Sequence, residues 1–203
     1  MFSKRIKKEI AKKPMPPLDL LDKNVFLANL LFCYQYMVAS HDLTVLAGNL
    51  ADGELKKYFT HHADEEKGHA EWLRADLLTE GIDAAEMAIS PYARGMVGEQ
   101  FYNVLYVHPA SLLGYMAMLE MNPMPLANVN TLEKAHGKAL LKTLRFHAEH
   151  DIDHSKDLCV VLDALPASLH GVVLQNLDRT ADFIRAGLDR INEFNRETVG
   201  RLH

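Results

Sequence analysis

Two stretches of the chain repeat the pattern His-x-x-x-acid-x-x-His, and this repeat constrains the fold more than any other feature. The six residues are His62, Glu66 and His69 in the first copy, and His147, Asp151 and His154 in the second. Offsets of four and seven residues return to nearly the same side of an α-helix, so each copy places imidazole, carboxylate and imidazole along one stripe. Imidazole and carboxylate together suit iron, manganese or zinc, and iron(II) is typical when open positions remain. Two facing stripes therefore offer ligands for two metal ions.

The composition is that of an ordinary globular domain. The 203 residues are 48% hydrophobic and 24% charged, and they suit one domain with a substantial core. The net charge of -5 gives no electrostatic footprint for nucleic acid. An apolar signal region, an uninterrupted run of 18 apolar residues and a disulfide framework are all absent from the sequence. We therefore expect a cytoplasmic protein, forming a homodimer, with no nucleic-acid or membrane partner.

The only basic cluster lies at the N-terminus, where FSKRIKKEIAKK precedes a PMPP breaker. This segment suits either a solvated tail or a short amphipathic helix. We assign residues 1–17 to this basic tail and residues 18–203 to a single helical domain.

Helical periodicity runs through almost every long segment, and strand-like alternation is absent. The expected helices cover residues 18–50 (with a break near 40–42), 53–80, 98–107, 109–121, 130–165 and 168–197. Gly81 is the natural stop of the second helix, and Asn130 is a candidate N-cap. The predicted architecture is an all-α bundle, in which metal sites are built from inward-facing side chains.

The second copy of the repeat predicts three metal ligands, which are His147, Asp151 and His154. With His150 they fall within an arc of roughly 100° on a helix, and flanking leucines lie near the same face. That face is therefore expected to point inward. His150 lies at the edge of the arc and is expected beside the ligands or in a channel rather than on a metal ion.

In the first copy, Glu66-x-x-His69 matches the Glu-x-x-His element of diiron carboxylate bundles. His62 and Glu65 sit on neighbouring positions and compete for the same role. A further carboxylate, Glu120, ends the apolar run LLGYMAMLE, where burial is costly unless the charge is paired or bound to metal. The alternative is that Glu120 simply marks the end of its helix.

Together these stretches resemble one known group of proteins. H-x-x-x-E-x-x-H, then P-x-x-L-L-G-Y-x-x-x-L-E, then H-x-x-x-D-x-x-H are similar to the haem-oxygenase-like diiron oxidases and oxygenases, also called iron-containing redox enzymes. The resemblance covers about residues 58–163. It implies a seven-helix, haem-oxygenase-like bundle whose metal ions lie between core helices.

The resemblance also implies a chemistry. Two Fe(II) ions (manganese being an alternative), O2 as co-substrate and an external electron donor would act on a small amino acid, amine or fatty acid. The reactions would be C–C cleavage, desaturation or N-oxygenation, often in specialised-metabolite biosynthesis. Carried over by motif, the ligands are Glu66, His69 and His147 for one ion and Glu120, Asp151 and His154 for the other.

Five residues near the motifs are candidates to line a substrate pocket, although each also suits plain core. They are Phe59, Tyr115, Met116, Met118 and Phe146. Four other functions stay open: a cofactor-independent or thiamine-processing protein of the same fold, a ferritin-like oxidase, a metal-storage module and a haem-degrading enzyme. The last would need one proximal histidine rather than paired stripes.

Overall fold

The computed structural model describes the backbone of residues 1–200 and the side chains of residues 1–193. Every regular element in this part of the chain is helical, which confirms the all-α prediction. The α-helices are α1 (Phe2–Ala11), α2 (Lys23–Met37), α3 (Ser40–Leu50), α4 (Gly53–Glu66), α5 (His69–Leu78), α6 (Pro91–Tyr106), α7 (Leu112–Glu120), α8 (Leu126–His136), α9 (Lys142–Ala164) and α10 (His170–Gly200). Four short 3-10 turns join them: η1 (Ala84–Glu86), η2 (Pro109–Ser111), η3 (Lys138–Leu141) and η4 (Ala167–Leu169).

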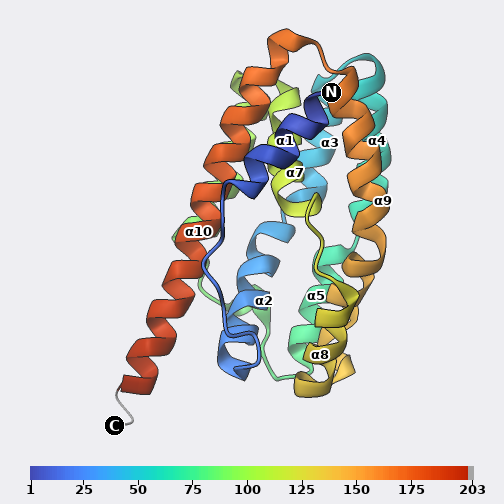
Figure 1. The fold of residues 1–203 in the computed structure, drawn as a ribbon. Coiled ribbons are helices and arrows are strands. Elements are labelled where there is room, and N and C mark those ends of the chain that lie inside the picture. The colour runs from blue at the N-terminus through green and yellow to red at the C-terminus, as the bar shows by residue number, and fades with distance from the viewer. Residues whose placement is uncertain (201–203) are drawn as a thin grey trace.

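The bundle has two halves, stacked end to end (Figure 1). Helices α3, α4 and α7 lie in one half, α2, α5 and α8 lie in the other, and α9 and α10 run past both. Each half has its own hydrophobic cluster: Phe59, Leu113 and Leu158 belong to one, and Phe26 and Leu141 to the other. The ends of α4, α5 and α7 meet at the level between the halves, so this joint collects the side chains at those helix ends.

The break between α4 and α5 corrects the prediction of one helix over residues 53–80. The chain leaves the helix at Lys67, and Gly68 adopts the left-handed conformation with φ 91°. That conformation is costly for residues with a Cβ and nearly free for glycine. As a result Glu66 ends one helix and His69 begins the next.

A second glycine corrects the prediction of one helix over residues 130–165. Gly137 has φ 91° and separates α8 from α9. Asn130 therefore lies inside α8 instead of capping a helix, and its side chain accepts a hydrogen bond from Arg145. Arg145 also forms an ion pair with Glu133 at 2.7 Å.

The other helix bounds follow local signals. The break between α2 and α3 falls at residues 38–39, close to the expected position. Gly81, with φ 75°, follows the end of α5 as expected. Helix α6 begins at Pro91, earlier than expected, because the Ser90 hydroxyl accepts a hydrogen bond from the Tyr92 amide and Pro91 suits the first helical position.

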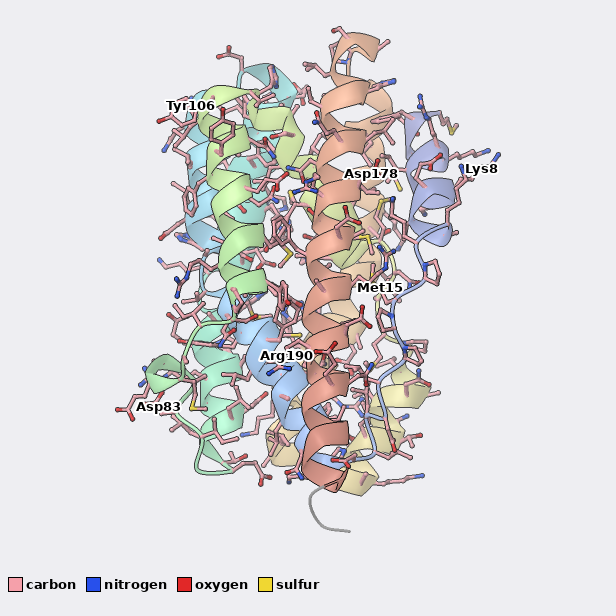
Figure 2. The ribbon with its side chains drawn as sticks, turned by 90° about the vertical axis from the view of Figure 1, so that its left-hand side faces the viewer. Lys8, Met15, Asp83, Tyr106, Asp178 and Arg190 are labelled. Atoms are coloured by element: carbon pink, nitrogen blue, oxygen red, sulfur yellow. The ribbon has the colours of Figure 1, made fainter. Side chains whose placement is uncertain are left out.

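The N-terminal segment forms the amphipathic helix α1, the second of its two expected forms, and α1 packs on the bundle. Phe2 and Ile6 are buried in the cluster shared with α7 and α10, and the Ser3 hydroxyl donates a hydrogen bond to Asp163. Figure 2 shows α10 along the height of the molecule, with α6 on one side and α1 on the other, and Lys8 projecting from α1. Among the described residues, no single helix is both long and apolar enough to cross a membrane, and the segments 138–164 and 167–193 meet those criteria only together, across a bend of 113°.

Close packing of α7 on α10 fixes the position of α7 in the bundle. A Cβ atom on Gly114 would overlap the Val173 carbonyl oxygen and lie 2.7 Å from the Leu177 amide nitrogen. Glycine is therefore required for this approach. The consequence for the site is that Glu120, the last residue of α7, is held at the joint between the halves.

Candidate metal centre

Eight histidine and carboxylate side chains meet at the joint between the two halves. Helix ends supply five of them, and the middle of α9 supplies the other three. They are His62, Glu65 and Glu66 from α4, His69 from α5, Glu120 from α7, and His147, Asp151 and His154 from α9. All six predicted ligands are thus brought together, and His62 and Glu65 lie directly among them.

Glu66 and His62 connect the helix ends in the first part of this group. One Glu66 oxygen, Oε1, lies 3.4 Å from His69 Nδ1 and 3.8 Å from His62 Nε2. The same His62 nitrogen lies 3.4 Å from Glu120 Oε1. Helices α4, α5 and α7 therefore converge within the reach of one or two ions.

The side chains of α9 complete the group. His147 Nδ1 lies 3.1 Å from Asp151 Oδ1, which is 3.7 Å from His154 Nδ1. His154 Nε2 lies 3.7 Å from Glu65 Oε2, and the His69 and His147 rings are 4.8 Å apart at their centroids. Since Glu65 Oε2 also lies 3.9 Å from His62, the contacts close into a ring, which we call the histidine–carboxylate ring.

One triad within this ring has its donor atoms close enough to share an ion. One ligand atom from each of His62, Glu65 and His154 lies within 4.8 Å of the other two. Ligand bonds of about 2.0–2.2 Å hold donor atoms on one ion at roughly 3–4.4 Å from each other. His62 and Glu65 therefore suit direct ligation as well as the neighbouring role.

Unpartnered atoms test whether a metal fits this ring. Four of the eight buried side-chain atoms that make no hydrogen bond to a described residue belong to the ring: His69 Nδ1, Glu120 Oε2, His147 Nε2 and His154 Nδ1. Buried polar atoms in folded proteins nearly always have partners, so such a cluster needs a cause. Imidazole nitrogen and carboxylate oxygen are the donors that iron, manganese and zinc take. The donor set therefore fits a metal centre.

The electrostatics of the ring favour a cation. Burial lowers the pKa of His62, but the charge and hydrogen bond of Glu120, followed by Glu66 and Glu65, raise it to about 9. Burial raises the pKa of Glu66, yet its close contact with His69 at 3.4 Å and the nearby imidazoles hold it below its ordinary value. The C-terminal ends of α4 and α7 add partial negative charge. The ring is thus built to surround positive charge, which in the metal-free protein an imidazolium supplies.

A cavity of about 210 Å³ lies directly beside the ring. His62, Glu66, Glu120, His147 and Asp151 form one wall. The other walls come mainly from α2, α3 and α7 and are largely apolar. Metal ligands that also line an apolar cavity place any bound small molecule next to the ions.

Of the predicted pocket residues, Tyr115 and Met116 line this cavity. Three others lie elsewhere, which corrects the prediction. Phe59 is fully buried in the core, Met118 faces a separate hollow beside α1, and Phe146 packs against Trp72. Each of these three residues lies on a helix that also lines the cavity, but its own side chain does not face the cavity.

His150 is also placed outside the centre. It is exposed, its ring stacks on Phe146 at 4.0 Å, and its Nδ1 lies 2.8 Å from the Phe146 carbonyl oxygen. The prediction of a channel residue or ligand neighbour therefore has no support in the contacts of His150.

Asp76 ties together the helices that carry the ligands. Its carboxylate is buried and accepts a hydrogen bond from the Thr143 amide at 2.8 Å, in the first turn of α9. This bond links α5, which begins at His69, to α9. Arg74 does not share in it, because its guanidinium pairs with Asp83 at 2.7 Å.

A solved structure has the same fold. It is the crystal structure of a domain of unknown function with a haem oxygenase-like fold from Shewanella denitrificans OS217, with a TM-score of 0.70 and 18% sequence identity over 98% of this chain and 92% of that chain. No protein-family model matches the chain, and no curated protein is similar to it in sequence. The chain therefore has a haem-oxygenase-like fold, as predicted. The resemblance to the diiron oxidases stays a prediction.

Proposed function

We propose that this protein is a non-haem diiron enzyme that uses O2 to oxidise a small organic substrate. The observation that carries this proposal is the closed histidine–carboxylate ring that forms one wall of an apolar cavity. A ring alone suits metal storage, and a cavity alone suits simple binding. The two side by side are what an enzyme needs to hold a substrate against a reactive metal.

The resemblance implies two sets of ligands for this role. Glu66, His69 and His147 would hold one ion; Glu66 Oε1 lies 3.4 Å from His69 Nδ1, and the His69 and His147 rings are 4.8 Å apart at their centroids. A second set, Glu120, Asp151 and His154, would hold the other. His62 and Glu65 lie between the sets and can add to either coordination sphere. Iron(II) ions held by these residues would supply O2 binding and part of the electrons for the oxidation.

The chain's own residues control access and protonation. Leu43, Leu73 and Leu112 line the cavity and exclude water from the substrate. The Glu65 side chain is 36% exposed and lies 3.7 Å from His154 Nε2, so its carboxylate can exchange protons with solvent at the edge of the ring. Histidines bind metal only in the neutral form, so loading displaces the proton that His62 carries in the metal-free protein.

The class of reaction comes from the resemblance. C–C cleavage, desaturation or N-oxygenation of a small substrate, with an external electron donor and in a biosynthetic pathway, is the proposed activity. A haem enzyme is disfavoured because the histidines are clustered among carboxylates rather than presented singly.

Anaerobic loading with Fe(II), followed by O2 and a panel of small substrates, tests the proposal. We expect O2 consumption to rise with one class of compound, and a visible absorption band to outlast mixing. His150→Ala is the matched control, because His150 lies on α9 but outside the ring, whereas His147→Ala should lose the response. Metal uptake with no substrate-dependent O2 consumption would overturn the enzyme and leave a metal-binding module.

A further inference from the structure

The hydroxyl groups on the cavity wall differ in whether the protein completes their hydrogen bonds. The Tyr36 hydroxyl donates to Cys33 Sγ at 3.2 Å. The Thr44 hydroxyl donates to the Ser40 carbonyl oxygen at 2.7 Å. The Tyr115 hydroxyl, in contrast, makes no hydrogen bond to a described residue, although the Ser40 side chain lies close to it. Buried polar atoms nearly always have a partner, so the Tyr115 hydroxyl needs one from elsewhere.

Thr143 has a second hydroxyl on the wall that makes no hydrogen bond to a described residue. Thr143 also borders the hollow beside Trp72, so a partner for its hydroxyl can come from outside the cavity. Tyr115 is only 3% exposed, and its side chain packs in the same hydrophobic cluster as the rest of α7. The cavity is therefore the space from which a partner can reach the Tyr115 hydroxyl.

The chemistry of the Tyr115 hydroxyl determines what this partner must carry. Burial raises the pKa of Tyr115 above its ordinary value, so the hydroxyl keeps its proton. A protonated tyrosine donates one hydrogen bond, which an acceptor atom completes. The wall around it is largely apolar, with Leu43, Leu112 and Met116 among the lining side chains. These groups together suit an apolar skeleton that carries one acceptor oxygen, such as a carbonyl.

The size of the cavity limits that skeleton. An apolar cavity of about 150 Å³ accepts benzene, so the 210 Å³ beside the ring accepts a molecule somewhat larger. Tyr115 precedes Glu120 by five residues on α7, which is about 7.5 Å along the helix axis. A molecule of that length, bonded to Tyr115 at one end, extends along the wall toward Glu120. Water is the alternative partner, because the cavity is also large enough to hold it.

From this geometry we infer that Tyr115 is a substrate-positioning residue, whose hydroxyl binds an acceptor oxygen on an otherwise apolar ligand and holds that ligand beside the ring. As a statement about substrate the inference rests on the proposed function, but the binding itself needs no metal. It narrows the substrate class to small apolar molecules that carry an acceptor oxygen. Among the substrates implied by the resemblance, simple amines lack this oxygen and are disfavoured.

Calorimetric titration of the metal-free protein tests this without turnover. The probes are acetophenone and ethylbenzene, which share a ring and a two-carbon side chain and differ in the carbonyl oxygen. We expect Tyr115→Phe to weaken acetophenone about fivefold, as loss of one hydrogen bond does, and to leave ethylbenzene nearly unchanged. A disturbed cavity would weaken both probes alike, so this difference separates positioning from a structural role.

Tyr36→Phe is the matched control, since it removes a hydroxyl from the same wall that already has a partner in Cys33 and should change neither probe. Three results would overturn the inference: no binding of acetophenone to the wild-type protein, equal effects of Tyr115→Phe on both probes, or no effect on either, which would assign the hydroxyl to water. The expected binding pattern without iron-dependent O2 consumption would contradict the proposed enzyme and leave the role of Tyr115 in ligand binding intact.

Discussion

Two polar clusters in the interior of this protein differ in how their hydrogen bonds are completed. The first joins α6 to α10 through Gln100, Asn176 and Thr180, whose exposed fractions are 0–1%. Asn176 donates to the Gln100 side-chain oxygen at 2.7 Å, and Thr180 donates to the Asn176 side-chain oxygen at 3.3 Å. This cluster is closed, because protein groups supply its partners.

The histidine–carboxylate ring is the second cluster, and described protein groups do not supply hydrogen-bond partners for all of its polar atoms. His62 and His69 are only 3% and 1% exposed, yet His69 Nδ1, His147 Nε2 and Glu120 Oε2 make no hydrogen bond to a described residue. A closed network stabilises a helix pair by itself. A buried group of metal-binding side chains with unpartnered donor atoms is instead complementary to a bound metal ion. The Gln100 cluster is therefore structural, whereas the histidine–carboxylate ring has the features of a binding site.

The largest expected effect comes from opening the ring. His154→Ala should lose one ion and reduce substrate-dependent O2 consumption by more than the roughly 10–100-fold that loss of a ligand's outer partner costs. The helical content of the metal-free protein should stay the same, because the change removes a ligand and little core. Metal analysis and circular dichroism measure both. Wild-type metal content in this variant would remove His154 from the centre.

The opposite result is expected in the closed cluster. Asn176→Leu keeps the branched shape of the side chain but leaves the Gln100 oxygen and the Thr180 hydroxyl without their partner, at a cost of about 1–3 kcal/mol. Denaturant unfolding of the metal-free protein measures this cost, and metal binding should be unchanged. A loss of metal without a loss of stability would erase the distinction between the clusters.

A smaller effect concerns pH. The pKa of His62 is raised from 6.5 to about 9 in the metal-free protein, so its imidazolium adds stability that is fully present below pH 6.5 and is lost as the pH rises through 9. The free energy of unfolding should decline over this interval, and His62→Gln should flatten the decline. Metal loading should flatten it too, because loading requires the neutral imidazole. An unchanged slope in His62→Gln would assign the decline to another group.

The smallest expected effect is that of Glu120→Gln. The amide keeps the shape but loses the charge beside His62, so affinity for one ion should fall more than affinity for the other. The stability of the metal-free protein should change by less than about 1 kcal/mol, because the lost attraction to His62 is offset by removal of the desolvation cost of the buried Glu120 carboxylate. A two-site metal titration measures this difference. Equal weakening of both sites would make Glu120 a bridge between the ions.

The sequence predicted the ligand-bearing stripes because their signals are local. Periodicity placed His147, Asp151 and His154 on one face, and the apolar run before Glu120 made that carboxylate conspicuous. Helix breaks were harder to predict. Gly68 lies among good helix formers, and only the structure shows its positive φ.

Contacts between side chains from distant segments could not be predicted from local sequence patterns either. Cys33 and Tyr36 line the cavity only because α2 packs against α5, α6 and α10, and Asp76 meets Thr143 across two helices. Glu65 enters the ring although it is one residue off the stripe, because α4 ends at Glu66 and His154 approaches from α9. Its proximity to Glu66 in the sequence was the only available signal.

Anaerobic titration of the wild-type chain with Fe(II) tests the central claim most directly, by counting tightly bound ions per chain. The histidine–carboxylate ring contains four histidines and four carboxylates, enough donors for two ions. The account predicts saturation at two ions per chain, with loss of one in His154→Ala. Saturation at a single ion would contradict the dinuclear centre, and no saturable binding would contradict the metal centre itself.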